Sequence, residues 1–352
     1  MKHNRLWYKL WPVAFLLFLV SQSPDVAQAG TPDWSDVAWS PDGTLLAAVG
    51  FDVALYTEDF ELVERIENYN ERGYYSTVAA WNPQGTHFAT FEADWGNRHG
   101  GLCGLALWQI NPLQLIHSET FCHELTPIRK MLRDATKPFW NAEGDELWFF
   151  STNDWSVYNL YVFDTMTYKV AVKTPPVNLE TTEDIPVVIA INDYILFAST
   201  TGARRENTLE TIVHRVDPAT GNLTEVLRLP DAIWSMSADE NRLALAGNEQ
   251  VYIYDLITGK QLRVLEATIF ESADRDIFLA RGFSWNSDGR FLAVSTITGA
   301  GIWETDTGMM IQALWEGVDI SAIDWQPNGT KVAMAAGYFE DLIQIIDVNL
   351  SN

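Results

Sequence analysis

The sequence is short of basic residues, cysteines and long apolar runs, and each shortage excludes a class of protein. Its 352 residues include 23 Lys and Arg against 47 Asp and Glu, which gives a formal net charge of -24. Such a chain lacks the basic surface that general nucleic-acid binding needs, so we expect no nucleic-acid partner. Two cysteines are too few for a disulfide-dense scaffold. After the first 20 residues, no apolar run is long enough to span a membrane.

Sequence signatures of catalysis are also absent. The chain has no Gly-x-Ser-x-Gly elbow, no phosphate-binding loop, no paired-cysteine metal motif and no His-Glu-x-x-His helix. Gly299-Ala-Gly301 lacks the third glycine of a dinucleotide site, and Asp274-Arg-Asp276 lacks the glycine and distal glutamate of a calcium loop. The sequence therefore predicts a protein without enzyme activity, bound metal or cofactor.

What is present is an export signal followed by enough apolar sequence for one large domain. Hydrophobic residues make up 47% of the chain, which excludes disorder. Residues 1–29 combine a basic start, an apolar run over 13–20 and the small residues of Ala27-Gln-Ala29, a pattern typical of a cleaved signal peptide. We expect the mature domain, residues 30–352, to be secreted or periplasmic, or otherwise extracytoplasmic. The alternative is an uncleaved apolar anchor.

A short motif recurs along the mature chain. It consists of a Trp, a tight turn rich in Pro, Asn, Asp and Gly, and an apolar run. The five plain copies begin at Trp39–Gly43, Trp81–Gly85, Trp140–Gly144, Trp285–Gly289 and Trp325–Gly329. A degenerate copy begins at Met236–Glu240, and a weaker one at Ile191–Asp193. The chain therefore contains seven repeats.

Each repeat predicts four short antiparallel strands. The motif supplies two strands, because the Trp ends one strand and the apolar run forms a second that is covered on both faces. An alternating third strand follows, such as Val251–Asp255 with its turn at Thr258-Gly259, and then a fourth, such as Gln261–Leu265. Units of this kind, about 40–50 residues long, are typical of propeller blades. The sequence predicts an all-β fold, a seven-bladed β-propeller of four-stranded antiparallel blades.

The Trp-Ser-Pro-Asp-Gly turn at Trp39–Gly43 and the Thr-Gly strand ends resemble those of the WD-repeat β-propeller family. The resemblance covers nearly all of residues 34–348. It implies a propeller architecture and says little about activity, because one fold supports many functions.

The last blade is incomplete at the C-terminal end. Strands are expected near 321–325, 331–336 and 342–348, after which only residues 349–352 remain. Three interpretations are open: a three-stranded last blade, an edge strand from about residues 30–34, or a strand added by a partner.

Cys103 and Cys122 are predicted to form a disulfide. They flank a hairpin that turns at Asn111-Pro112. If the residue numbers of residues paired across its two antiparallel strands sum to 225, Cys103 and Cys122 lie opposite each other. An exported protein is where such a bond persists. Free thiols are one alternative. A zinc site with His99 and His123 is another, although Cys122 and His123 point to opposite faces of a strand.

Five long connections fall on one face of the predicted ring, where long loops on a rigid fold often bind ligands. They are residues 92–103, 121–139, 171–186, 201–211 and 266–281. These segments hold ten basic and 13 acidic residues, so they are far less acidic than the rest of the chain. The candidate binding residues there are Trp95, Arg129, Lys130, Arg133, Arg204 and Arg205. The alternative is that these side chains are ordinary solvated loop residues.

Taken together, these patterns favour a monomeric, exported, non-catalytic propeller. We expect it to be a binding platform, a rigid surface that binds a protein partner or an anionic ligand through its long-loop face. The alternative is a propeller hydrolase or lyase acting on an extracellular polymer, because carboxylates from several blades can meet in the fold and form an acid–base pair.

Overall fold

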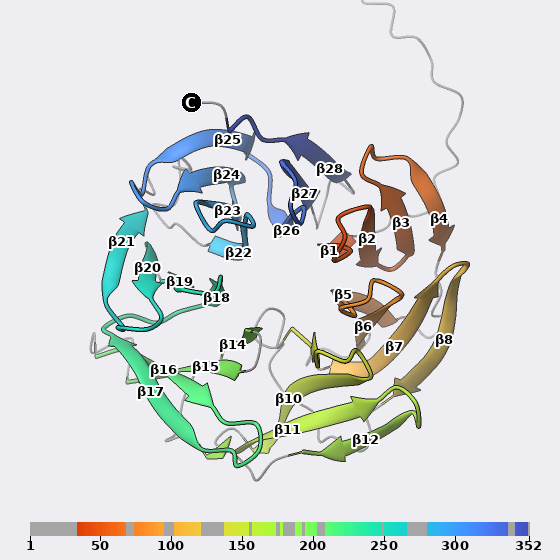
Figure 1. The fold of residues 1–352 in the computed structure, drawn as a ribbon, viewed down its shortest axis with the longest axis horizontal. Coiled ribbons are helices and arrows are strands. Elements are labelled where there is room, and N and C mark those ends of the chain that lie inside the picture. Colours follow the sequence, from red (N-terminus) through yellow and green to blue (C-terminus); the bar gives the residue numbers. More distant parts are fainter. Residues whose placement is uncertain are drawn as a thin grey trace, which may run out of the picture. The chain divides into compact units, whose positions relative to one another are not determined.

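The strands between Trp34 and Asp347 form seven antiparallel sheets that follow one another round a ring (Figure 1). The computed structural model describes residues 34–67, 74–94, 102–120, 137–154, 157–173, 177–178, 187–191, 194–202, 208–247, 250–265, 280–336 and 342–350. In these ranges every regular element is a β-strand, and no helix there is long and apolar enough to cross a membrane. The predicted all-β, seven-bladed propeller is confirmed.

The first three blades are meanders in which each strand pairs with the next. Blade one contains β1 (Trp34–Trp39), β2 (Leu45–Gly50), β3 (Val53–Thr57) and β4 (Leu62–Ile66). Blade two contains β5 (Tyr74–Trp81), β6 (His87–Asp94), β7 (Leu102–Ile110) and β8 (Leu113–Thr120). Blade three contains β9 (Phe139–Trp140), β10 (Glu146–Asp154), β11 (Val157–Asp164), β12 (Lys169–Val172) and a short extra strand, β13 (Val177–Asn178), that also pairs with β11.

The remaining blades repeat the same order. Blade four contains β14 (Val187–Ile191), β15 (Tyr194–Thr201), β16 (Glu210–Val216) and β17 (Leu223–Leu229). Blade five contains β18 (Ser235–Ala238), β19 (Arg242–Ala246), β20 (Val251–Asp255) and β21 (Gln261–Leu265). Blade six contains β22 (Ala280–Trp285), β23 (Phe291–Thr296), β24 (Gly299–Glu304) and β25 (Met310–Glu316). Blade seven contains β26 (Ile320–Trp325), β27 (Lys331–Ala336) and β28 (Leu342–Asp347).

In the turns that the structure describes, the recurring motif forms a tight turn at the end of the innermost strand, as the sequence predicts. The turn of blade four, residues 192–193, lies outside the described residues. In blade one, the backbone N–H of Gly43 donates to the carbonyl of Ser40 at 2.8 Å. Gly43 has a φ of +73°, and a Cβ at this position would lie 2.9 Å from the carbonyl oxygen of Pro327 in blade seven. Glycine is therefore required both by the turn and by the close approach of the neighbouring blade.

Two of the five recurring tryptophans join neighbouring blades, whereas the indole N–H of Trp325 donates within its own turn, to the carbonyl of Gly329 at 3.0 Å. The indole N–H of Trp81 donates to the carbonyl of Ala38 at 2.9 Å, and that of Trp140 donates to the carbonyl of Ala80 at the same distance. In each case the acceptor is the residue before the Trp of the preceding blade. The repeat motif therefore connects one blade to the next as well as ending a strand.

The core of the described domain is divided among seven hydrophobic clusters, each between two neighbouring sheets. The second strand of a blade is almost fully buried, as in β23 and β27, because it is covered on both faces. The outermost strand is largely exposed, as in β21. Stability of the ring therefore depends on packing between blades.

Side chains of blade seven close the ring against blade one. The amide of Gln326 donates to the carbonyl of Gly43 at 2.7 Å, and the ammonium of Lys331 donates to the carbonyl of Glu58 at 2.9 Å. The hydroxyl of Ser321 donates to the carbonyl of Trp34 at 3.1 Å. Within the described residues blade seven has three strands. Of residues 30–34, predicted as its edge strand, Trp34 belongs instead to β1, where it pairs with Gly50, and residues 30–33 lie outside those ranges.

The meander places its turns on two opposite faces. The first-to-second and third-to-fourth strand turns of every blade emerge on one face, which we call the short-turn face. The strand ends that the second-to-third turns and the links between blades join lie on the other face, the long-loop face. The sequence placed the candidate binding residues on the long-loop face.

Candidate functional site

The candidate residues of the long-loop face lie outside the described residues. These are Trp95, Arg129, Lys130, Arg133, Arg204 and Arg205. Their predicted role in binding therefore stays a prediction, and the site is built here from the residues that the structure describes.

The strand register used to place Cys103 opposite Cys122 is wrong. Gly104 pairs with Thr120, so paired numbers in this part of the hairpin sum to 224 rather than 225. Nearer the turn, the numbers of paired residues sum to 223, as in Trp108 with Leu115. An irregularity between Leu107 and Trp108 adds one residue to β8, so the sum beyond it is 224. Cys122 and the side chain of Cys103 lie outside the described residues, so the disulfide itself stays a prediction.

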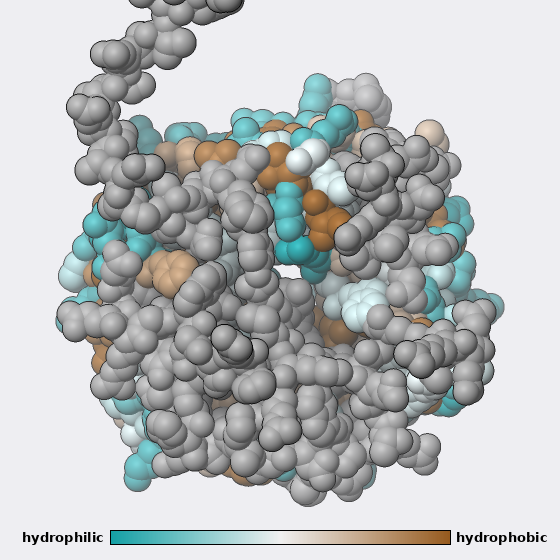
Figure 2. All heavy atoms as spheres, turned by 180° about the vertical axis from the view of Figure 1, so that it is seen from behind, coloured by the Kyte–Doolittle hydropathy of each residue, from teal (hydrophilic) through white to brown (hydrophobic). Residues whose placement is uncertain are grey.

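The centre of the ring is lined by residues of the innermost strands. Figure 2, which shows the ring from behind, has a narrow opening near the middle with hydrophilic residues along one side. A cavity of about 130 Å³ lies there and includes Asp36, Lys137, Arg281 and several serines. The buried carboxylate of Asp36 accepts a hydrogen bond from the N–H of Ala79 at 3.0 Å, and the ammonium of Lys137 lies 3.4 Å from it.

Asp324 lies on the innermost strand of blade seven, directly before Trp325. Its carboxylate accepts a hydrogen bond from the N–H of Trp39 in blade one at 2.8 Å, and another from the hydroxyl of Ser284 in blade six at 2.9 Å. Burial raises the pKa of Asp324 to about 6, against the opposing effects of these hydrogen bonds and of Lys137. Asp36 and Asp324 therefore act as bridges between blades, because each accepts a backbone N–H of the next blade in the ring.

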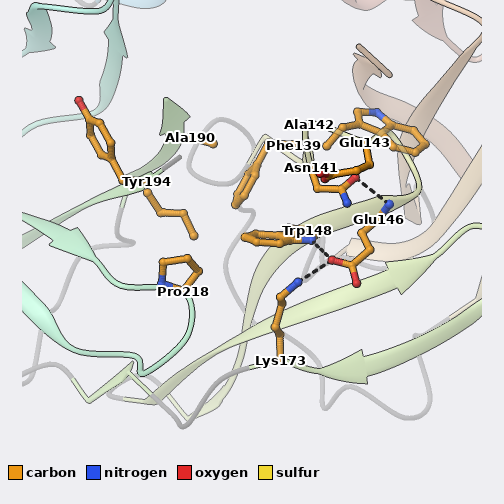
Figure 3. Close-up of a pocket in the computed structure, with 12 residues that line it drawn as sticks. Phe139, Asn141, Ala142, Glu143, Glu146, Trp148, Lys173, Ala190, Tyr194 and Pro218 are labelled. Carbon is orange, nitrogen blue, oxygen red and sulfur yellow. Dashed lines mark hydrogen bonds and ion pairs between the residues drawn. The ribbon is translucent and has the colours of Figure 1, made fainter. Parts of the chain in front are cut away.

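A larger cleft lies between blades three and four on the short-turn face (Figure 3). Its volume is about 330 Å³, within the range of small ligand sites. The lining residues come from the ends of β9, β10, β14 and β15, from the turn after β9 and from the turn after β16. They are Phe139, Trp140, Asn141, Ala142, Glu143, Glu146, Trp148, Lys173, Ala190, Tyr194, Ile195 and Pro218.

Blade three contributes an aromatic ring held by an ion pair. The indole N–H of Trp148 donates to Glu146 Oε2 at 2.8 Å, and Lys173 Nζ donates to the same oxygen at 2.5 Å. Lys173 Nζ also lies 3.8 Å from the centroid of the Trp148 ring, a favourable cation–π distance. Phe139 packs against Trp148 with ring centroids 5.9 Å apart. These contacts fix Trp148 at one wall of the cleft.

Blade four contributes the opposite wall. Tyr194 begins β15, and the guanidinium of Arg215 lies 4.2 Å from the centroid of its ring. Ile195 is buried, and Pro218 lies in the turn after β16. Figure 3 shows Tyr194 and Pro218 across the cleft from Trp148. Beneath the cleft, the two sheets pack through an apolar cluster that includes Phe150.

The arrangement suits binding of an amphipathic group. The walls carry apolar surface from Trp148, Tyr194 and Ile195, and the charges of Glu146 and Lys173 are matched to each other. Glu143 also lines the cleft and adds a carboxylate. Within the described ranges, no cluster of three or more His, Cys, Asp or Glu side chains is placed to bind a metal ion.

Sequence reasoning missed this cleft because its walls come from different repeats. Trp148 and Tyr194 are 46 positions apart, and neither is the Trp or a turn residue of the recurring motif. The available signal was the surplus of aromatic residues, Phe139, Trp148 and Tyr194, next to two consecutive turns of the same face.

Comparisons with known proteins support the fold. No protein-family model matches the chain, and no curated protein matches it. Among solved structures, 1132 chains match, so the fold by itself does not select a function. One of them, titled "Structure of U3-55K", aligns with a TM-score of 0.63 and 11% identity over 91% of this chain and 97% of that chain. Membership of the WD-repeat family stays a prediction.

Proposed function

We propose that the chain is an exported, non-catalytic β-propeller that acts as a binding platform. The observation that carries this proposal is the cleft between blades three and four, with its apolar walls and its Glu146–Lys173 ion pair. A cleft of this size on a rigid fold offers a preformed site, which reduces the ordering cost of binding. The hydrogen bonds of Asp36 and Asp324 support the non-catalytic part of the proposal. Both carboxylates at the centre of the ring accept backbone N–H groups of a neighbouring blade, which is a structural role.

The long-loop face is the second proposed binding surface. Its connections are far less acidic than the rest of the chain, which suits an anionic ligand, whereas the cleft lies on the opposite and more acidic face. The two surfaces can therefore be distinguished by separate variants.

The proposal predicts that a partner binds through the cleft. The mature chain, residues 30–352, would be used to capture proteins from an envelope and medium extract, beside two variants. In the first, Ala190→Phe, a large side chain fills the cleft from β14. The second replaces Arg129, Lys130, Arg133, Arg204 and Arg205 with alanine. We expect Ala190→Phe to reduce retention of a partner at least about tenfold. This corresponds to a loss of about 1.4 kcal/mol in binding free energy, because the new side chain blocks a contact site.

Other outcomes of this capture have defined meanings. Loss in the five-site variant alone would move the site to the long-loop face. Equal retention by all three proteins would contradict binding at either surface. Failure to retain any protein, together with turnover in a screen of polysaccharides, would replace the platform with the hydrolase or lyase alternative.

Export is proposed from the pattern of residues 1–29. The expected result is that protein recovered outside the cytoplasm begins at Gly30, as determined by intact-mass spectrometry and N-terminal sequencing. Protein that retains Met1 would contradict cleavage and favour the anchor alternative.

A further inference from the structure

The short-turn face is strongly acidic. The twelve described turns on this face connect consecutive strands of the blades, and together they hold eleven Asp and Glu against two basic residues, Lys260 and Arg290. Of the two basic residues, Arg290 is already paired with Glu304 at 2.9 Å. An anionic partner would be repelled from this face, and a cationic one would be attracted and steered to it.

Three of the turn carboxylates are held in their ionised form. The hydroxyl of Ser40 lowers the pKa of Asp42, and that of Thr220 lowers the pKa of Asp217. The backbone N–H of Arg290 lowers the pKa of Asp288. These carboxylates therefore remain charged at neutral and mildly acidic pH.

Charge at the mouth of the cleft is negative and unbalanced. The two nearby cations already have partners: Lys173 pairs with Glu146, and Arg215 lies over the ring of Tyr194. Within the part of the chain that the structure describes, no Lys or Arg pairs with Glu143, Asp145 or Asp217. A partner that brings basic groups to this mouth would find carboxylates with no competing cation.

The walls of the cleft favour an aliphatic side chain over a sugar. A sugar ring stacks on an open aromatic face, but Figure 3 shows Lys173 and Phe139 on opposite sides of Trp148. One face of Tyr194 is likewise covered by Arg215. The remaining space is bordered by ring edges and by aliphatic surface such as that of Ile195, which suits an aliphatic group.

We propose that this cleft binds a short segment of a partner protein in which an aliphatic side chain is flanked by lysine or arginine. The aliphatic group enters between Trp148 and Ile195, and the basic groups lie against Glu143, Asp145 and Asp217. This inference rests on the proposed platform function and adds the chemical class of the partner.

The test uses a fluorescent nine-residue peptide with a central leucine, two lysines on each side and glycine elsewhere. Two comparison peptides carry serine in place of leucine or glutamate in place of every lysine. Fluorescence anisotropy with the mature chain should show saturable binding of the first peptide only. Binding should weaken about tenfold or more between about 50 and 300 mM salt, because the charges are at the surface.

Matched variants locate the binding. Glu143→Lys should raise the Kd of the leucine peptide about fivefold or more, whereas Glu240→Lys, an equivalent charge change in the turn of blade five, should raise it less than about twofold. Both side chains are exposed, so neither change disturbs the core. Ala190→Phe should abolish binding, with its melting temperature measured as a check on folding.

Equal binding of the lysine and glutamate peptides, or equal effects of Glu143→Lys and Glu240→Lys, would overturn the inference. If the leucine peptide fails to bind while Ala190→Phe still loses a captured partner, the platform and its cleft stand and the chemical class is wrong. If both results are negative, the platform proposal fails at this site as well.

Discussion

Asp324→Asn is expected to stabilise the protein by up to about 3 kcal/mol above pH 7 and to have little effect below pH 4. Asp324 is half-buried on the innermost strand of blade seven, and loss of hydration there raises its pKa to about 6. An asparagine of the same shape can accept the hydrogen bond from Trp39 and donate one to Ser284, but it never ionises. The variant therefore keeps the interblade bonds and removes the cost of a buried charge.

The direction of the pH effect follows from proton binding. Between the ordinary Asp pKa of 3.8 and about 6, the folded protein holds the Asp324 proton more tightly than the unfolded chain does. The stabilising contribution is thus complete below 3.8 and is lost as pH rises through about 6. The difference in melting temperature between wild type and Asp324→Asn should grow over this window.

Asp324→Ala is the matched control for this experiment. It removes the charge and also both hydrogen bonds, which leaves the buried N–H of Trp39 without its acceptor. We expect a loss of about 2–3 kcal/mol at pH 5, where the wild-type carboxyl is mostly protonated. A pH-independent difference between wild type and Asp324→Asn would contradict the account of this residue.

Trp108→Ala is expected to lower the free energy of unfolding by about 4 kcal/mol. Trp108 is fully buried between blades one and two, where it stacks on Phe88 with ring centroids 6.1 Å apart. Its indole N–H donates to the buried hydroxyl of Thr90 at 3.1 Å. Removing the ring leaves a cavity in one of the seven interblade clusters. Urea unfolding, followed by circular dichroism, measures the loss.

Leu262→Ala provides the comparison, because Leu262 lies on the outermost strand of blade five and is 40% exposed. Its expected cost is below about 0.5 kcal/mol. Equal losses for the two variants would show that packing between blades does not dominate stability.

The architecture was predictable because the strands and turns of each blade follow from residues within a single repeat. The strands expected at Val251–Asp255 and Gln261–Leu265 are β20 and β21 to the residue. The turn at Gly43 needs a positive φ that glycine accepts readily, so its residue type marked its position. In these segments the local strand and turn preferences agree with the packing of the folded ring.

The candidate site depends on long-range geometry that no repeat encodes. Trp39 and Asp324 meet across 285 positions, and Trp148 faces Tyr194 only because two blades pack side by side. The hairpin register next to Trp108 was predicted wrongly, because one extra residue in a strand leaves no mark on the apolar pattern. Side chains that line a cleft between repeats are therefore visible only in the folded ring.

Hydrogen–deuterium exchange of the mature chain, with and without its captured partner or the leucine peptide, tests the central claim most directly. Binding in the cleft predicts slower exchange in residues 139–148, 190–196 and 217–219, with little change on the long-loop face. Slower exchange confined to residues 92–103, 121–136 and 203–207 would contradict the cleft and assign binding to the opposite face.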